Sequence, residues 1–238
     1  MAIRRRAIHT EDKEERYHAI LDAAERLLLR LTGRGPSMAG VADEAGLAKG
    51  TVYLYFRSKE ELLFALLERN IDDFFLALAG MLEGSAPLGI DQILALMERK
   101  IVEPPLFLPL AGRCFGGIGE GLPLDVARAF NARMAGRLAR AGAGLERHFQ
   151  ELRAGDGAVL LRHSYALILG FWQTARSAAI RYAPRPPGAA IDDHAAALAR
   201  SGAQDLERAL RALWEGTLNR DVSRAAQRPP KARSDGAV

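Results

Sequence analysis

Between residues 48 and 59 the sequence combines small residues with side chains that can donate hydrogen bonds. The small residues are Ala48 and Gly50, and the donors are Lys49, Thr51, Tyr53, Tyr55 and Lys59. A helix that enters the major groove of DNA needs small residues near its N-terminus for close approach and donors around them for the phosphates. Taken singly, Tyr53 and Tyr55 fit packing aromatics and Lys59 fits a first-turn residue. The assembled spacing favours contact with DNA.

Patterns that would support catalysis or metal binding are missing from the sequence. The five histidines are scattered without the spacing of ligands, and the single cysteine, Cys114, cannot form a zinc site with any neighbour. The Lys49-Gly50-Thr51 run lacks the spacing of a phosphate-binding loop, and the glycines at 117–121 do not match the dinucleotide fingerprint. We therefore expect no catalytic residues, no metal and no cofactor.

Composition is that of an ordinary globular protein. The 238 residues include 33 Lys and Arg against 29 Asp and Glu, a formal net charge of +4, and 49% are hydrophobic. The longest apolar runs, such as 74–82, are far shorter than the roughly 20 residues that span a bilayer. No apolar signal region follows the N-terminus, and one cysteine fits a reducing compartment. We expect a cytoplasmic protein without a membrane partner.

Helical periodicity dominates the chain, and alternating β-branched runs are nearly absent, so we predict an all-α fold. Apolar residues recur every three or four positions from Ile20 to Leu31, where Gly33 and Gly35-Pro36 end the first long helix. Eight further helices are predicted, about nine in all, at 38–45, 49–56, 58–83, 90–102, 106–117, 123–153, 156–182 and 191–217.

Two short helices joined by a tight turn give residues 37–56 the outline of a helix-turn-helix. Ser37 can cap the first helix, and Gly46 can adopt the positive φ that the turn demands. Ser58 and Glu61 have the spacing of a capping box at the start of the next helix. The predicted small core consists of Val41, Ala42, Ala45, Leu47, Val52 and Phe56.

Two stretches of this region resemble the TetR family of bacterial transcriptional regulators. They are Ala-Gly-Leu-Ala-Lys-Gly-Thr-Val-Tyr-Leu-Tyr-Phe-Arg-Ser-Lys-Glu-Glu-Leu at 45–62 and Ile-Leu-Asp-Ala-Ala-Glu-Arg-Leu-Leu at 20–28. The resemblance covers residues 14–70. It implies a three-helix DNA-binding domain at 14–72, with its motif at 37–56, and a larger helical domain for ligand binding and dimerisation at 73–218. A flexible basic arm at 1–13 and a disordered basic tail at 219–238 would flank them.

The resemblance also implies roles in DNA binding. Ser37 and Tyr55 would contact phosphates, with Thr51 and Lys59 also near the DNA backbone. Lys49, Gly50 and Tyr53 would face the groove, and Leu54 would lie where bases are read. The remaining contacts would come from Met38 and Ala48. Two residues depart from the family's pattern. Ala48 replaces the usual capping Ser or Thr, which lowers the stability of the helix that follows by about 1 kcal/mol. Gly40 lies inside the preceding helix and lowers the stability of that helix by about 1 kcal/mol relative to Ala. We expect a mobile DNA-reading head in the free protein.

For the larger domain, the resemblance implies a homodimer through the helices at 156–182 and 191–217, although these apolar faces also fit the core of a monomer. Candidates for an effector pocket are Phe107, Cys114, Phe115, Met134, Leu138, His163, Phe171, Trp172, Gln173 and Arg176. Most of these residue types also fit a core. Arg176 is the sharpest candidate, because a buried arginine requires an anionic partner. The glycines between 112 and 121 fit a helix connection or a hinge.

The resulting hypothesis is a ligand-responsive, nucleoid-associated repressor. A small apolar or amphipathic effector would release it from an inverted repeat in double-stranded DNA by favouring a different spacing of the two heads. One alternative is an effector-independent nucleoid or cell-division factor with the same fold. Another is an all-α enzyme, which would need convergent titratable groups in a cleft.

Overall fold

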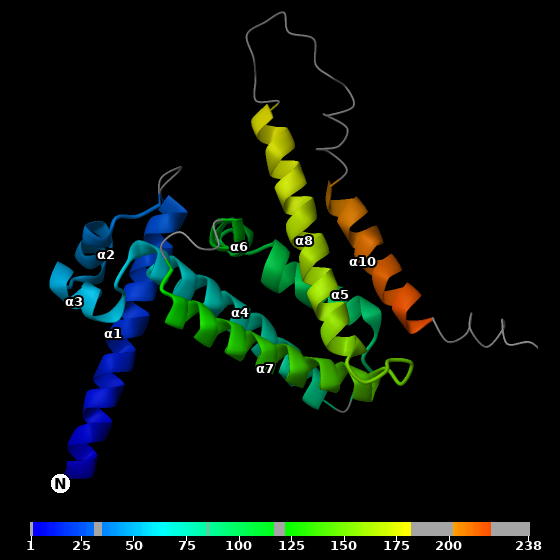
Figure 1. The fold of residues 1–238 in the computed structure, drawn as a ribbon, viewed down its shortest axis with the longest axis horizontal. Helices are drawn as coiled ribbons and strands as arrows, with labels where there is room; N and C mark the ends of the chain where they lie inside the picture. Colours follow the sequence, from blue (N-terminus) through cyan, green and yellow to red (C-terminus); the bar gives the residue numbers. More distant parts are fainter. Residues whose placement is uncertain (1, 31–34, 85, 117–121, 182–201, 220–238) are drawn as a thin grey trace, which may run out of the picture.

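A computed structural model of the chain describes residues 2–30, 35–84, 86–116, 122–181 and 202–219. Within these ranges every regular element is a helix, so the all-α prediction is confirmed (Figure 1). The elements are α1 (Ala2–Arg30), α2 (Met38–Ala45), α3 (Lys49–Tyr55), α4 (Lys59–Glu83), α5 (Ile90–Met97), the π-helical η1 (Glu98–Val102), α6 (Phe107–Gly116), α7 (Leu124–His148), α8 (Asp156–Arg181) and α10 (Gly202–Leu218). None of these helices is long and apolar enough to cross a membrane.

Several helices differ in their bounds from the prediction. α1 begins at Ala2, so residues 2–13 form its first turns; this segment contains neither Gly nor Pro to break a helix. α7 ends at His148, short of the predicted 153, because Phe149 leaves the helix with φ −111° and ψ 92° and buries its ring. Residues 191–201 of the last predicted helix lie outside the described residues, as does the tail from 220.

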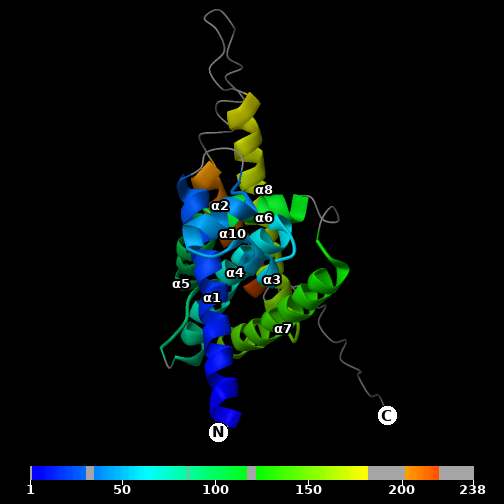
Figure 2. The ribbon, with the colours of Figure 1, turned by 90° about the vertical axis from the view of Figure 1, so that its left-hand side faces the viewer.

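The head of the molecule, α1 to α3 with the start of α4, packs around a small apolar core (Figure 2). Val41 of α2, Val52 of α3 and Phe56 after it are buried, as predicted. The ring of Phe56 lies 5.1 Å from that of Tyr17, which ties the end of α3 to α1. Ion pairs add to this packing, because Glu44 of α2 accepts hydrogen bonds from Arg26 and Arg30 of α1.

The larger domain is built on α4, which runs out of the head and continues along α7 (Figure 1). α7 packs on α8, and α8 and α10 lie side by side at the end of the molecule opposite the head. The contact of α7 with α8 is close, because a Cβ built on Gly142 would lie 2.5 Å from the backbone nitrogen of Ala158. In the pair α8 and α10, the indole of Trp214 donates to the buried hydroxyl of Ser164 at 3.0 Å.

Candidate nucleic-acid interface

The turn between α2 and α3 has the geometry that its sequence predicts. The hydroxyl of Ser37 accepts a hydrogen bond from the backbone N–H of Gly40 at 3.0 Å and caps α2. Gly46 ends α2 with φ 67°, a left-handed conformation in which a side chain is strained. A local contact explains the glycine at position 40, because a Cβ on Gly40 would lie 3.3 Å from the capping hydroxyl of Ser37. A glycine inside α2 therefore leaves room for the cap that starts it.

α3 buries one side and exposes the other. Val52 is fully buried and Tyr55 half-buried, whereas the opposite side consists of Lys49, Gly50, Tyr53 and Leu54, all exposed. Steps of about 100° per residue place these four on one continuous face, here called the α3 face. The α3 face contains the residues that were predicted to face the groove and its bases.

The α3 face is unusual in what it exposes. Leu54 is 84% and Tyr53 43% exposed, and the ammonium group of Lys49 lies 5.9 Å from the centre of the Tyr53 ring. A cation–π contact at this distance orients both side chains. No atom lies within 4 Å of the place where a Cβ on Gly50 would be, so the middle of the face is open. The face therefore offers a cation, a phenol and an apolar side chain around a gap.

The remaining predicted DNA-binding residues do not lie on the α3 face, and several of them are partly or fully buried. Ala48 precedes α3 without a side-chain cap, as expected, and Thr51 is half-buried. Met38 is only 7% exposed, so a DNA contact there would have to come from its backbone. Lys59 is half-buried and its ammonium group donates to the carbonyl oxygen of Gly35 at 3.1 Å. The structure brings four of the predicted residues onto one face, and the others lie outside that face.

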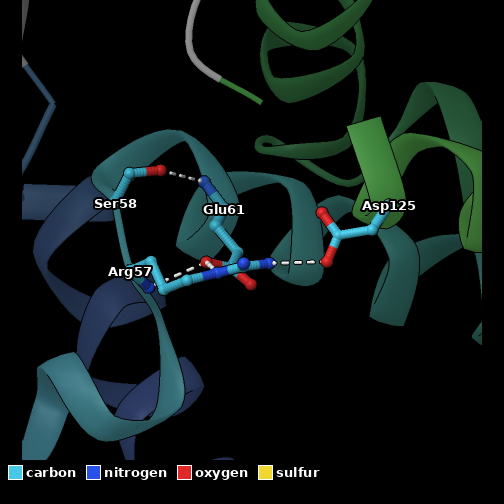
Figure 3. Close-up of polar contacts among 4 residues, drawn as sticks. All are labelled: Arg57, Ser58, Glu61 and Asp125. Carbon is cyan, nitrogen blue, oxygen red and sulfur yellow. Dashed lines mark hydrogen bonds and ion pairs between the residues drawn. The ribbon is translucent and has the colours of Figure 1, made fainter. Parts of the chain in front are cut away.

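The start of α4 is capped in a way that the spacing predicts only in part (Figure 3). The Ser58 hydroxyl accepts from the Glu61 N–H at 3.1 Å, but the Glu61 carboxylate accepts from the N–H of Arg57 at 2.7 Å, not from that of Ser58. Arg57 also reaches Asp125 of α7, with Nη2 3.2 Å from Oδ2. This hydrogen bond lowers the pKa of Asp125 and raises the pKa of Arg57.

Two adjacent residues of α4 hold the head and the larger domain together. Arg69 donates to Asp22 and Glu25 of α1, each at 2.6 Å. Glu68 accepts from Arg133 at 2.6 Å and from Arg137 at 3.0 Å, both on α7. Burial acts to raise the pKa of Glu68, but the hydrogen bonds of the two arginines outweigh it and the pKa lies below its ordinary value. The sequence analysis missed this network. Its one signal in the sequence is the spacing of Arg133 and Arg137, which places both arginines on the same face of a helix.

A cavity of about 240 Å³ lies in the larger domain, here called the α4–α8 cavity. Its lining residues are Ile71, Phe74, Phe75, Met97, Ile101, Phe107, Phe130, Asn131, Met134, Leu138, Leu161, Arg162 and Tyr165. Three of the predicted pocket residues belong to it, namely Phe107, Met134 and Leu138.

Among the other predicted pocket residues, Cys114, His163, Phe171, Trp172 and Gln173 are described by the structure and do not line this cavity. Cys114 packs against the core, where burial raises its pKa to about 11. Trp172 and Phe171 are half-buried, and Trp172 covers Gly112, where a Cβ would lie 2.6 Å from its ring. His163 and Gln173 are exposed, and the side chains of Phe115 and Arg176 lie outside the described residues. Within the described part of the chain, no cluster of three or more His, Cys, Asp and Glu could hold a metal ion.

Comparison with known proteins gives a separate family match for each of the two domains. Residues 20–66 match the family described as "Bacterial regulatory proteins, tetR family", and residues 68–221 match "Tetracyclin repressor-like, C-terminal domain". The "Fatty acid metabolism regulator protein" of Bacillus subtilis is 33% identical over 64 residues, 27% of this chain and 33% of the relative. An uncharacterised HTH-type transcriptional regulator of Haemophilus influenzae is 41% identical over 59 residues, 25% of this chain and 32% of the relative.

Each alignment thus spans about a third of the relative, and it is the family matches that extend over most of the chain. The second of these matches alone covers more than half of the sequence. From its capped helix-turn-helix head to its helical second domain, the chain belongs to the TetR family of bacterial regulatory proteins.

Proposed function

We propose that this protein is a homodimeric, DNA-binding repressor of transcription that acts at the nucleoid in the cytoplasm. It binds an inverted repeat and is released by a small apolar or amphipathic effector. The observation that carries the proposal is the α3 face, where Lys49, Tyr53 and Leu54 stand exposed around Gly50. An exposed helix face with donors around a gap suits the major groove, where side chains meet the edges of the bases.

A dimer follows from the size of this face. One helix of seven residues reads few base pairs, and two-fold symmetry doubles the contacts. α8 and α10 offer a surface for pairing, because Ala166 and Gly170 of α8 and Ala212 and Gly216 of α10 are exposed. Small residues four positions apart on each helix allow close approach of a second pair of helices.

α6 is the element that could couple the effector to the head. Its Phe107 lines the α4–α8 cavity, and its Gly112 packs under Trp172 of α8. Its Arg113 reaches the loop before α2, where a Cβ on Gly35 would lie 3.4 Å from both Arg113 Nη1 and Lys59 Nζ. An effector that displaces Phe107 would move α6 against this loop, and the two positions of the head would differ in affinity for DNA.

The test of DNA binding starts from fragments selected from random duplex DNA by the full-length protein. Lys49→Ala should change the preferred bases, because Lys49 lies on the α3 face. Lys59→Ala and Tyr55→Phe should weaken binding to all sequences alike and reduce the salt dependence. Arg99→Ala, an exposed arginine of η1 away from the head, is the control. Absence of selected sequences, or an equal loss for all three head variants, would contradict the proposal.

The alternative of an effector-independent nucleoid or cell-division factor shares the head and the dimer. The two functions differ in the role of the α4–α8 cavity. Met134→Trp would fill the cavity without touching α3. A repressor with an effector should then keep its affinity for DNA and lose release by ligand. A factor without an effector should show no ligand-dependent release in either protein.

A further inference from the structure

The α4–α8 cavity is lined mainly by apolar residues, and few polar residues stand among them. Phe107, Met97 and Ile101 are buried residues of its lining, whereas Asn131 of α7 and Arg162 of α8 are exposed residues of the same lining. Asn131 and Arg162 lie on facing helices, since α7 packs on α8. Asn131 and Arg162 therefore bring polar, solvent-exposed groups to a lining that is otherwise largely apolar.

Arg162 is the one charged residue that lines this cavity among the residues that the structure describes. No carboxylate lines the cavity beside it, and no ion pair joins Arg162 to another described residue. In the same molecule Arg57, Arg69, Arg133, Arg137 and Arg211 all form ion pairs with Asp or Glu. A guanidinium without a carboxylate at the mouth of an apolar cavity is suited to an anionic group of a bound molecule, which it can meet with two parallel hydrogen bonds.

The volume of the cavity limits the size of this molecule. An apolar cavity of about 150 Å³ holds benzene, which corresponds to about 25 Å³ for each non-hydrogen atom. At the same ratio, 240 Å³ holds about ten non-hydrogen atoms. The aromatic rings of the lining, among them Phe74, Phe107 and Phe130, suit an aliphatic chain or an aromatic ring equally.

We infer that the effector is an apolar monocarboxylate of about ten non-hydrogen atoms, with its carboxylate at Arg162 and its apolar body in the cavity. The inference rests on the proposed function, because it names the chemical class of the proposed effector. It places the anionic group at Arg162, whereas the sequence analysis expected an anchor among His163, Gln173 and Arg176. A neutral alcohol of the same length would lose the charged contact, and an amine would be repelled.

Isothermal titration calorimetry of the full-length protein tests this class with octanoate, which has ten non-hydrogen atoms, and with octan-1-ol and octylamine. 3-Phenylpropionate is the aromatic probe. At least one of the two acids should bind about tenfold more tightly than octan-1-ol, the effect of one charge-assisted contact at a partly exposed site. Octylamine should bind most weakly. Weak binding of both acids, no better than the alcohol, would overturn the inference.

Variants of Arg162 show whether this side chain sets the preference. Arg162→Gln should reduce acid binding about tenfold, to the level of the alcohol, and Arg162→Glu should reverse the preference towards octylamine. Because Arg162 is exposed, neither change should unfold the domain. Arg128→Gln, an exposed arginine of α7 that does not line the cavity, is the matched control and should bind like the parent protein. An unchanged preference in Arg162→Gln would overturn the inference.

DNA binding, measured separately, keeps this inference distinct from the proposed function. Acid binding that depends on Arg162 supports the ligand class even when the acid does not release DNA, in which case the role as effector fails. A protein that binds DNA but neither acid keeps the DNA-binding part of the proposed function and loses the inference.

Discussion

The α3 face and the α4–α8 cavity are two binding surfaces built in opposite ways. The face is a convex set of exposed residues from one short helix, and none of its four members belongs to the core. The cavity is lined by residues from several helices, and most of them also hold those helices together. Substitutions on the face should therefore change binding with little effect on stability, whereas substitutions around the cavity should change both.

The largest expected effect belongs to the packing that forms the cavity. In Gly142→Ala, the new Cβ would lie 2.5 Å from the Ala158 nitrogen and 3.0 Å from its Cα, so α7 and α8 must separate. We expect a loss of about 3 kcal/mol in the free energy of unfolding, because backbone at a close helix crossing has no room to yield. Urea denaturation of the full-length protein measures it.

Gly136→Ala on the same helix is the control for this change. Its nearest neighbour would be the flexible end of Arg140 at 3.5 Å, so the substitution should stabilise α7 by about 0.5–1 kcal/mol. Gly142→Ala should therefore lower the free energy of unfolding, and Gly136→Ala should raise it. If both variants unfold at the same urea concentration, the close contact of α7 with α8 does not exist as described.

The second effect lies at the junction between the two regions. Glu68→Gln removes the charge that Arg133 and Arg137 share, and the side chain of Arg137 is only 10% exposed. We expect about 1–2 kcal/mol of destabilisation at neutral pH, because the poorly hydrated guanidinium of Arg137 loses one of its two anionic partners and keeps Asp72 at 2.5 Å. Since the folded-state pKa of Glu68 is lowered, its contribution is complete above the ordinary pKa of glutamate and is lost as the pH falls through the lowered value.

Urea midpoints at several pH values separate this effect from a simple loss of packing. The difference between the parent protein and Glu68→Gln should be constant near neutrality and should shrink in acid. A difference that does not change with pH would show that the glutamate acts through its shape and not through its charge.

How well the sequence predicts each region follows from how far apart its residues lie in the chain. The hydroxyl caps at Ser37 and Ser58 and the turn at Gly46 depend on neighbours within four residues, and they are in the structure as expected, apart from the return bond of Glu61, which goes to Arg57. The hydrogen bond from Lys59 to Gly35 joins residues 24 positions apart, and sequence reasoning missed it.

The α4–α8 cavity shows the same limit. Phe107, Met134 and Leu138, which the sequence analysis named as candidates for an effector pocket, do line this cavity. Which polar residue of α8 lines the cavity depends on the rotation of that helix against α7, and long-range packing sets this rotation. Arg162, three residues before Tyr165 on the same lining, was therefore overlooked.

The third prediction separates binding from stability on the α3 face. Gly50→Ala places a methyl group where no atom lies within 4 Å, so it should stabilise the free protein by about 0.5 kcal/mol. The same methyl group would fill the gap that DNA should enter, and we expect affinity for the selected sequence to fall about tenfold, the effect of one lost base contact. Fluorescence anisotropy and urea denaturation measure the two quantities.

Gly80→Ala of α4 is the matched control, because its Cβ would also meet no atom within 4 Å and it lies far from α3 in the chain. It should stabilise the protein as Gly50→Ala does and leave the affinity for DNA unchanged. Equal affinity of the two variants would remove Gly50 from the proposed interface.

The smallest effect is expected at the exposed ion pair of Arg57 with Asp125, which joins the head to the start of α7 (Figure 3). Both side chains are more than half exposed, so solvent screens their attraction and the urea midpoint of Arg57→Gln should match that of the parent protein. The pKa of Asp125 should nevertheless rise towards its ordinary value in this variant, because the hydrogen bond of Arg57 is the main cause of its lowering. Titration of the carboxyl carbon by NMR measures that shift. The contrast with Glu68→Gln then tests where the two regions are joined. A midpoint that falls as far in Arg57→Gln as in Glu68→Gln would show that the exposed pair contributes as much to the connection as the network on α4.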